Sequence, residues 1–334
     1  MLIELSVAGL ISFISTFILT HFIAEFMKKI NHVGIDIHKP EKPKIPTSCG
    51  ISIIIGLVLG ILLLVKLFPN YAPLMITFIA TVIIASIIGL VDDFIVLGGL
   101  SKMGLTLTSF LPIALLSLLR PDVYVFGRPE VPIIGRLRLT IVYWFILPFI
   151  IAGPANAVNM LDVLNGVMPL TTIMASLSLL ISSLLLKREL GIILSLILLA
   201  SLLGYLPYNI YPAKVFSGDC GSLGVGAALG AIALLARLEI VALVALFPHI
   251  MNAFYVIAFV KGFKEHRQFP RPTKVTEKGI IIDSGNPRAP ITLVRLIAGS
   301  EGAKENEIVK NICILQVIAS CLAVITAFLI SIAT

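Results

Sequence analysis

Residues 72–93 read APLMITFIATVIIASIIGLVDD, and this stretch decides the class of the protein. Twenty residues without a charge precede the two aspartates, which is the length an α-helix needs to cross about 30 Å of hydrocarbon. Similar runs recur along the chain, and 58% of all residues are hydrophobic whereas only 13% are charged. Because a soluble domain carries about 25% charged residues, this composition argues against a soluble enzyme and a disordered chain. It predicts a polytopic membrane protein.

A search for apolar runs of this length finds ten candidate spans, so we expect an all-α protein with one integral membrane domain over residues 1–334. The spans are expected at 2–26, 50–68, 72–91, 104–120, 139–156, 166–186, 190–208, 221–236, 239–261 and 308–332. The repeated halves of many secondary transporters are not evident. Residues 121–138 alternate like a small β-hairpin around a Gly/Pro turn, and 262–307 form the one long polar loop.

The basic residues predict the orientation of the chain. If the loop after the first span faces the cytoplasm, seventeen of the twenty-five lysines and arginines lie on the cytoplasmic side. This bias follows the positive-inside rule, and it places both termini and the 121–138 hairpin outside and the 262–307 loop in the cytoplasm. The net charge of +7 is thus assigned to membrane topology, and no nucleic-acid partner is expected.

Two adjacent carboxylates end the span quoted above. Ionisable groups at a membrane are costly and are functional candidates by default, which singles out Asp92 and Asp93. Their mutual repulsion favours keeping one of them protonated and available as a base, although a solvated helix end would also explain the pair. Gly98 and Gly99 break the helix after them, which allows Lys102 to turn back toward the carboxylates.

The segment NAVNMLDVLNG, residues 156–166, carries three polar side chains at every third position. On a helix, Asn156, Asn159 and Asp162 would therefore share one arc about 120° wide. Amide and carboxylate oxygens bind hard cations such as Mg²⁺ and hydrogen-bond to sugars or bases. A merely polar helix end is the alternative interpretation.

A third segment, FSGDCGSLG at residues 216–224, surrounds Asp219 with small residues. A carboxylate beside the N-terminus of a helix suits a Mg²⁺–phosphate site. Close helix packing is the alternative, and the GxxxG pattern from Gly226 to Gly230 is expected to serve it. Packing alone does not require the aspartate, however.

The polar loop contains a basic stretch, KGFKEHRQFPRPTK. His266, Arg267 and Arg271 are suited to anchoring a pyrophosphate or a sugar, with neighbouring prolines stiffening the loop. Ordinary positive-inside residues are the alternative. All four segments fall on the predicted cytoplasmic face, and this convergence indicates an active site there.

In this order, VDDF with the downstream Lys102, NAVNMLDVLNG, FSGDCGSLG and HRQFPR resemble segments of the polyprenyl-phosphate N-acetylhexosamine-1-phosphate transferases. The pattern is closest to the dolichyl-phosphate GlcNAc-1-phosphate transferase type. The resemblance implies transfer of GlcNAc-1-phosphate from UDP-GlcNAc to a polyprenyl or dolichyl phosphate with release of UMP. It also implies Mg²⁺ or Mn²⁺ as cofactor, a first membrane step of N-glycan-like assembly, and an active site on the cytoplasmic side of the cell membrane.

The resemblance implies roles for individual residues as well. The implied catalytic residues are Asp92, Asp93, Lys102 and Asp162, the first two handling the lipid phosphate. The implied metal ligands are Asn159 and Asp219. The implied substrate-binding residues are Asn156, Asn165 near the uridine, Phe216, His266 and Arg267 in the sugar-recognition loop, and Arg271.

The sequence departs from the known family patterns at two places. It lacks the His-His-His run of the bacterial peptidoglycan translocase, which argues against a muramyl-pentapeptide substrate. Glu265 stands where the eukaryotic relative has an arginine, so Lys264 or Arg271 would have to supply that contact with the pyrophosphate. Asp162, in contrast, follows the bacterial pattern, and this mixture is typical of an archaeal enzyme.

Two alternatives stay open at this point. Within the family, the alternative is a bacterial-type undecaprenyl-phosphate sugar-1-phosphate transferase. Outside it, a secondary transporter would have charges at mid-membrane depth and repeated broken helices. The sequence leaves open whether the protein forms a homodimer.

Overall fold

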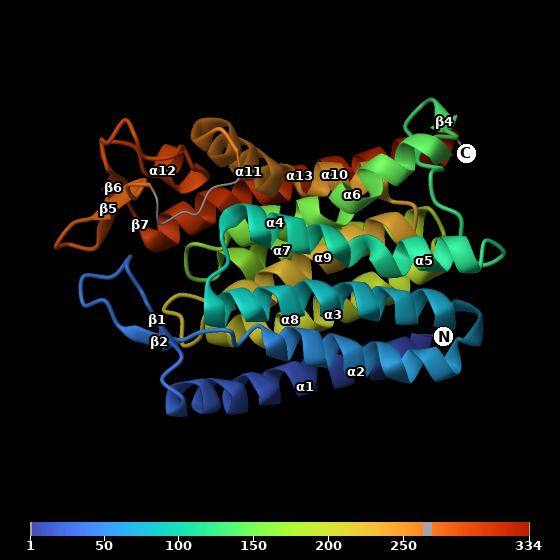
Figure 1. Cartoon of the computed structure of the whole chain (residues 1–334), viewed down its shortest axis with the longest axis horizontal. Coiled ribbons are helices and arrows are strands. Elements are labelled where there is room, and N and C mark those ends of the chain that lie inside the picture. The colour runs from blue at the N-terminus through green and yellow to red at the C-terminus, as the bar shows by residue number, and fades with distance from the viewer. Residues whose placement is uncertain (1, 263–268, 334) are drawn as a thin grey trace.

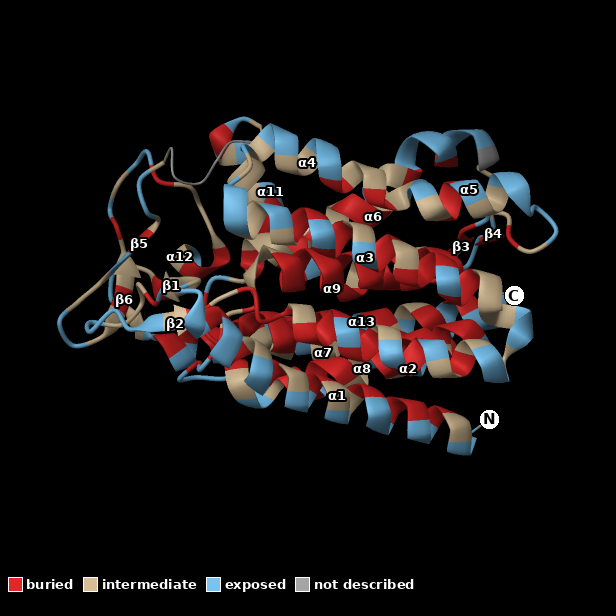
Figure 2. Ribbon diagram, turned by 60° about the horizontal axis from the view of Figure 1, so that its bottom comes forward, coloured by how far each residue is buried: buried red, intermediate tan, exposed pale blue. Residues whose placement is uncertain are grey.

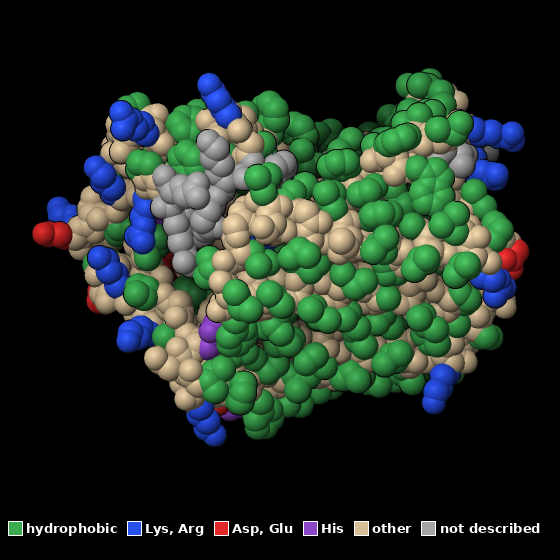
Figure 3. Space-filling view, in the orientation of Figure 1, with side chains coloured by type: hydrophobic (Ala, Val, Ile, Leu, Met, Phe, Trp, Pro, Cys, Tyr) green, Lys and Arg blue, Asp and Glu red, His purple; other side chains and the backbone are tan. Residues whose placement is uncertain are grey.

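The fold is a bundle of long helices with small strands at its two ends. The computed structural model describes residues 2–262 and 269–333. Most helices run along the long axis, with β1, β2, β5, β6 and β7 at one end and β4 at the other (Figure 1). Figure 3 shows hydrophobic side chains over the flank of the bundle and basic side chains mainly at its ends. This distribution is typical of a helical bundle that spans a membrane.

Helices account for most of the described chain. They are α1 (Leu2–Lys29), α2 (Ile51–Leu67), α3 (Ala72–Ile95), α4 (Gly99–Leu107), α5 (Leu111–Leu119), α6 (Thr140–Leu161), α7 (Val167–Leu185), α8 (Glu189–Asn209), α9 (Gly218–Leu235), α10 (Glu239–Ala245), α11 (Phe247–Val260), α12 (Leu293–Ala298) and α13 (Glu305–Ala333). Two 3-10 turns, η1 (Pro69–Tyr71) and η2 (Thr108–Phe110), precede α3 and join α4 to α5. The strands are β1 (Val33–Ile35), β2 (Lys44–Pro46), β3 (Glu130–Val131), β4 (Gly135–Arg136), β5 (Thr273–Val275), β6 (Ile280–Asp283) and β7 (Ala303–Lys304).

The predicted ten spans correspond to ten apolar segments of the described chain. Eight of them are long and apolar enough to cross a membrane, α10 and α11 together form a bent ninth, and α2 is a shorter apolar helix of 17 residues. The all-α membrane fold is therefore confirmed. The protein is an integral, multi-pass membrane protein.

The ninth span differs from its prediction as one helix over 239–261. It bends by 70° between α10 and α11, at Leu246. Pro248 lies in the first turn of α11. Because proline lacks the N–H needed inside a helix but is tolerated in the first turn, a new helix begins here instead of the old one continuing.

The predicted hairpin is confirmed, but its strands are only two residues long, with Glu130 opposite Arg136 and Val131 opposite Gly135. The Glu130 carboxylate is fully buried and lies 2.5 Å from Arg188 and 2.7 Å from Arg136. The pair with Arg188 fastens the hairpin to the start of α8, and the pair with Arg136 joins its two strands. The sequence does not predict the other sheets, β1–β2 and β5–β6–β7, because strands of two to four residues carry too little alternation.

Helix α9 forms the centre of the bundle. Every residue from Cys220 to Leu235 is buried, and Figure 2 shows α9 as an almost continuous buried element. A Cβ added to Gly226 would lie 2.5 Å from the Cα of Ala155 in α6. The close packing predicted from the GxxxG pattern is confirmed, because only glycine allows the two backbones to approach so closely.

A second apolar cluster attaches the polar loop to the bundle. Leu161, Leu164 and Val167 around the α6–α7 turn pack with Ile281 of β6 and Leu293 of α12. This contact holds the β5–β6–β7 sheet against the same end of the bundle at which α6 ends. The candidate site lies at that end.

Candidate active site

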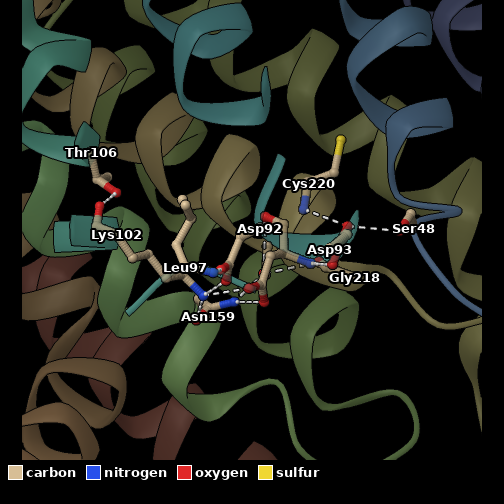
Figure 4. Close-up of polar contacts among 11 residues, drawn as sticks. Ser48, Asp92, Asp93, Leu97, Lys102, Thr106, Asn159, Gly218 and Cys220 are labelled. Carbon is tan, nitrogen blue, oxygen red and sulfur yellow. Dashed lines mark hydrogen bonds and ion pairs between the residues drawn. The ribbon is translucent and has the colours of Figure 1, made fainter. Parts of the chain in front are cut away.

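Lys102 joins three helices at one point. Its Nζ lies 2.9 Å from Asp92 Oδ2 at the end of α3 and 3.1 Å from Asn159 Oδ1 near the end of α6. It also pairs with Asp219 Oδ2 at the start of α9. Figure 4 shows the Lys102 side chain reaching from α4 toward Asp92 and Asn159. The structure thus brings together four of the predicted site residues, which come from four separate segments of sequence.

The turn after α3 makes this reach possible. Val96 adopts the left-handed conformation at φ 56°, and its N–H donates to the Asp92 carbonyl. The Leu97 N–H donates to the Asp92 carboxylate, and Gly98 is extended before α4 begins. Lys102 turns back as predicted, but only to Asp92, and the reversal begins at Val96 and not at the predicted Gly98–Gly99 break, since Gly99 already begins α4.

Asp93 points away from Lys102 and contacts the first turn of α9. Its Oδ1 accepts from the Asp219 N–H at 2.8 Å, and its Oδ2 accepts from the Cys220 N–H at 3.2 Å and from Ser48 Oγ at 2.7 Å. The N-cap residue Ser217 makes no side-chain cap bond to α9 in the described structure. Asp93 therefore caps α9 from another helix, where a carboxylate also suits the positive end of the helix dipole.

Asn159 fixes the Asp219 side chain from the opposite side. Its Nδ2 donates to Asp219 Oδ1 at 2.6 Å and to Ser222 Oγ at 2.8 Å. The Oδ1 of the same amide faces Lys102. This double use of one amide orients both the carboxylate and the ammonium group.

The oxygen atoms of this cluster fit a hard cation. Oxygens of Asp92, Asn159 and Asp219 surround one positive group, the Lys102 ammonium. Mg²⁺ binds through one or two carboxylates and completes its shell with water and substrate phosphates. Within the described residues no group of three or more histidines, cysteines and acids is arranged to hold a metal. The described part of this cluster thus offers two carboxylates and one amide as oxygen donors.

Asp162 and Asn156 do not share the position of Asn159. Asp162 follows the last residue of α6 and its carboxylate accepts from Ser217 Oγ. Desolvation raises the pKa of Asp162 to about 7, against the opposing effect of the Ser217 hydrogen bond. Asn156 donates to the Ala152 carbonyl of its own helix at 2.8 Å. Of these three side chains Asn159 is the one that contacts Lys102 and Asp219, whereas Asp162, the C-cap of α6, contacts Ser217 and Asn156 contacts its own helix.

Asn165 lies in a different buried cluster. Its backbone N–H donates to Glu305 Oε1 at 2.8 Å and its Nδ2 donates to Asp36 Oδ2 at 3.1 Å. Lys39 completes the cluster, 3.0 Å from Asp36 and 2.7 Å from Glu305. Burial lowers the pKa of Lys39, but its hydrogen bonds to Glu305 and Asp36 outweigh this effect and raise it overall. The cluster borders a pocket of about 490 Å³ between the β1–β2 hairpin, the β5–β6 turn and the start of α13.

The remaining predicted residues are placed as follows. Phe216 packs beside β1, with its ring within 3.1 Å of the position that a Cβ on Gly34 would take. Arg271 is exposed. His266 and Arg267, together with Lys264 and Glu265, lie outside the described residues.

Sequence reasoning missed Ser48, Ser217, Asp36 and the Lys39–Glu305 pair. Ser48 lies just before the predicted second span, in PTSCG. Small residues at such a place indicate an ordinary loop. Asp36 and Lys39 lie three residues apart in a polar loop. Ser48, Asp36 and Lys39 carry no local sequence signal of a site, because the residues they contact are distant in sequence.

Fold and site together define a helical membrane protein in which two carboxylates and an amide surround one lysine where its helices end. Residues 75–237 match the family model described as glycosyl transferase family 4. A protein of Methanocaldococcus jannaschii, provisionally named a glycosyltransferase, is 31% identical over 318 residues, which is 94% of each chain. This chain belongs to glycosyl transferase family 4, and the resemblance to the polyprenyl-phosphate N-acetylhexosamine-1-phosphate transferases is confirmed at the level of the family.

Two further relatives cover most of the chain. A Sulfolobus acidocaldarius protein, provisionally named a UDP-N-acetylglucosamine–dolichyl-phosphate N-acetylglucosaminephosphotransferase, is 26% identical over 97% of this chain and 96% of its own. The phospho-N-acetylmuramoyl-pentapeptide-transferase of Bacillus subtilis is 28% identical over 72% and 76%. The secondary-transporter alternative loses its support, because the chain belongs to a transferase family.

Proposed function

We propose that this protein transfers GlcNAc-1-phosphate from UDP-GlcNAc to a polyprenyl or dolichyl phosphate and releases UMP, at the cytoplasmic face of the membrane. The observation that carries the proposal is the Lys102 ammonium held among Asp92, Asn159 and Asp219 where three helices end. Both substrates are anionic, and Asp92 and Asp219 together outweigh the single charge of Lys102, so the approach of the substrates requires a further cation at this place. The printed name of the Sulfolobus acidocaldarius relative supports the choice of substrates.

Asp219 and Asn159 are the residues that would hold Mg²⁺. When bound, the cation would neutralise charge on the diphosphate of the nucleotide sugar. Lys102 adds a second positive charge at the same place, and its carboxylate and amide partners keep it there. Asp93 keeps the start of α9, and thus Asp219, in place.

Asp92 is the carboxylate suited to orienting the lipid phosphate. Its Oδ1 is fixed by the Leu97 N–H and its Oδ2 by Lys102. We favour direct attack, in which an oxygen of the lipid phosphate bonds to the β-phosphorus while the bond to the bridging oxygen breaks and UMP leaves. A lipid phosphate is already a competent nucleophile, so a covalent aspartyl intermediate would add a step without supplying a missing group. Asp93 is a poor nucleophile for another reason, because three donors already engage its two oxygens.

The test is UMP release by the purified protein in lipid nanodiscs. UDP-GlcNAc, UDP-GalNAc and UDP-MurNAc-pentapeptide are each combined with polyprenyl phosphate, dolichyl phosphate or no acceptor. We expect UMP from UDP-GlcNAc only when a lipid phosphate is present, and none from the Asp219→Asn variant. The proposal would be overturned if UDP-MurNAc-pentapeptide were the only donor that yields UMP, or if no donor and acceptor together yielded UMP.

A further inference from the structure

A row of side chains connects the loop after α1 to the capping aspartate of α9. Ser48 Oγ donates to Asp93 Oδ2 at 2.7 Å, and His32 Nε2 lies 2.9 Å from the same Ser48 oxygen. The His32 ring also stacks on Phe94, with the ring centroids 4.2 Å apart and the planes inclined by 13°. Figure 4 shows Ser48 approaching Asp93 from the side opposite Lys102.

The direction of these hydrogen bonds is fixed by the number of protons. A serine hydroxyl has one proton, and Ser48 gives it to Asp93. The lone pairs of Ser48 Oγ are then left for a donor, so Nε2 of His32 must carry a proton. His32 therefore donates to Ser48, which donates to Asp93.

The backbone around Ser48 is held against the start of α9. The Cys49 N–H donates to the Phe216 carbonyl and the Gly50 N–H to the Ser217 carbonyl, both at 3.0 Å. A Cβ on Gly218 would lie 2.7 Å from the Cα of Ser48. Ser48 itself is in the left-handed region at φ 59°, a conformation that costs energy for a residue with a Cβ. The surrounding contacts maintain it in the position from which its hydroxyl reaches Asp93.

We propose that His32 and Ser48 are positioning residues for the transfer reaction. Through Asp93 they would fix the first turn of α9, which carries Asp219 opposite Lys102. This inference rests on the proposed function for its kinetic readout. The segment between α1 and α2, which contains His32 and Ser48, would in this way set the geometry of a site formed by helices α3, α4, α6 and α9.

The test is a double-mutant cycle with His32→Phe and Ser48→Ala. His32→Phe keeps an aromatic ring for Phe94 but removes the donor, and Ser48→Ala removes the hydroxyl but keeps the Cβ. Each variant should lower kcat about five- to tenfold, which is the rate change that corresponds to the net free energy of one hydrogen bond. Because His32 acts through Ser48, adding His32→Phe to Ser48→Ala should cause little further loss. A second full loss in the double variant, or wild-type kcat in either single variant, would overturn the proposal.

Three further variants separate positioning from general damage. His32→Gln restores a donor and should recover part of kcat, whereas no recovery would contradict the hydrogen-bond argument. Ser48→Gly also lacks the hydroxyl but relieves the left-handed strain, so it should lose as much kcat as Ser48→Ala. If kcat fell in Ser48→Ala but not in Ser48→Gly, the effect would come from backbone strain and the proposal would be rejected. His21→Phe, an exposed histidine of α1, is the matched control and should retain wild-type kcat.

A second readout needs no substrate. Cys220 is buried and its N–H is bonded to Asp93, so site-resolved alkylation of Cys220 reports whether the first turn of α9 is held. Alkylation should be faster in His32→Phe and Ser48→Ala, and no faster in the double variant than in Ser48→Ala. Unchanged alkylation in both single variants would overturn the inference. If the wild type releases no UMP, the proposed function fails while the alkylation result still decides whether His32 and Ser48 hold α9.

Discussion

The backbone N–H of Asp219 donates a 2.8 Å hydrogen bond to the carboxylate of Asp93. This bond joins the end of α3 to the start of α9, the two segments that carry the acidic side chains of the site. Asp92, which precedes Asp93 in the sequence, faces Lys102 instead. Two adjacent aspartates thus have separate tasks, since one holds the helix that carries Asp219 and the other contacts the lysine.

Asp219→Asn should abolish UMP release and weaken its dependence on Mg²⁺ while the protein stays folded. An amide keeps the volume of the side chain but lacks the charge that a hard cation requires. The measurement is UMP release during an Mg²⁺ titration, with thermal unfolding as the check on folding. Wild-type turnover at ordinary Mg²⁺ would remove Asp219 from the metal site.

Lys102→Met should lower kcat by about a hundredfold or more and reduce the free energy of unfolding by about 3 kcal/mol, because it leaves two poorly exposed carboxylates without their cation. Adding Asp92→Asn removes one of the unpaired charges. The double variant should therefore regain stability and stay inactive. Thermal unfolding and UMP release measure the two effects, and recovery of activity in the double variant would contradict the role of Lys102.

Direct attack requires both substrates together, so lipid-free enzyme should not exchange labelled UMP into UDP-GlcNAc. The control adds lipid phosphate, which should permit exchange. The covalent mechanism predicts the opposite: exchange without lipid that is lost in Asp92→Asn or Asp93→Asn. Observation of that pattern would establish an aspartyl intermediate.

Labelling of introduced cysteines checks the orientation. Lys278 is exposed at the β5–β6 turn and is a better position than the neighbouring Gly279, which has φ 72°. In sealed cells a membrane-impermeant maleimide should fail to label Lys278→Cys but should label Asp122→Cys, which is exposed at the other end of the bundle. Cys313 and Cys321 are first replaced by serine, because only Cys49 and Cys220 of the native cysteines are buried. The reverse labelling pattern would invert the topology.

Asp162 should make stability depend on pH. Desolvation raises the pKa of this carboxyl from 3.8 to about 7 in the folded protein. Folding is therefore favoured by its protonated form, and this contribution is complete below about pH 4 and is lost as the pH rises through 7. The melting temperature of the wild type should fall between about pH 4 and pH 7, and that of the Asp162→Asn variant should fall less. Parallel curves for the two proteins would show that Asp162 does not titrate in this way.

The sequence by itself determined the membrane class, the ten apolar segments, and Lys102 with the three residues that meet it as site candidates. Those properties depend on local signals, because an apolar run and a charge near a membrane end are visible without knowledge of any partner. Gly98 and Gly99 predicted the return of Lys102 for the same reason, although the break itself lies at Val96 and Gly99 begins α4.

Only the tertiary structure decided how these residues divide their work. Asp92 and Asp93 are neighbours on one helix, so their side chains leave it in directions about 100° apart, and the helices packed around α3 determine what each meets. Asn165 meets Glu305, 140 residues away, and His32 reaches Asp93 through Ser48. No pattern along the chain encodes such contacts, because they arise only when separate helices pack together.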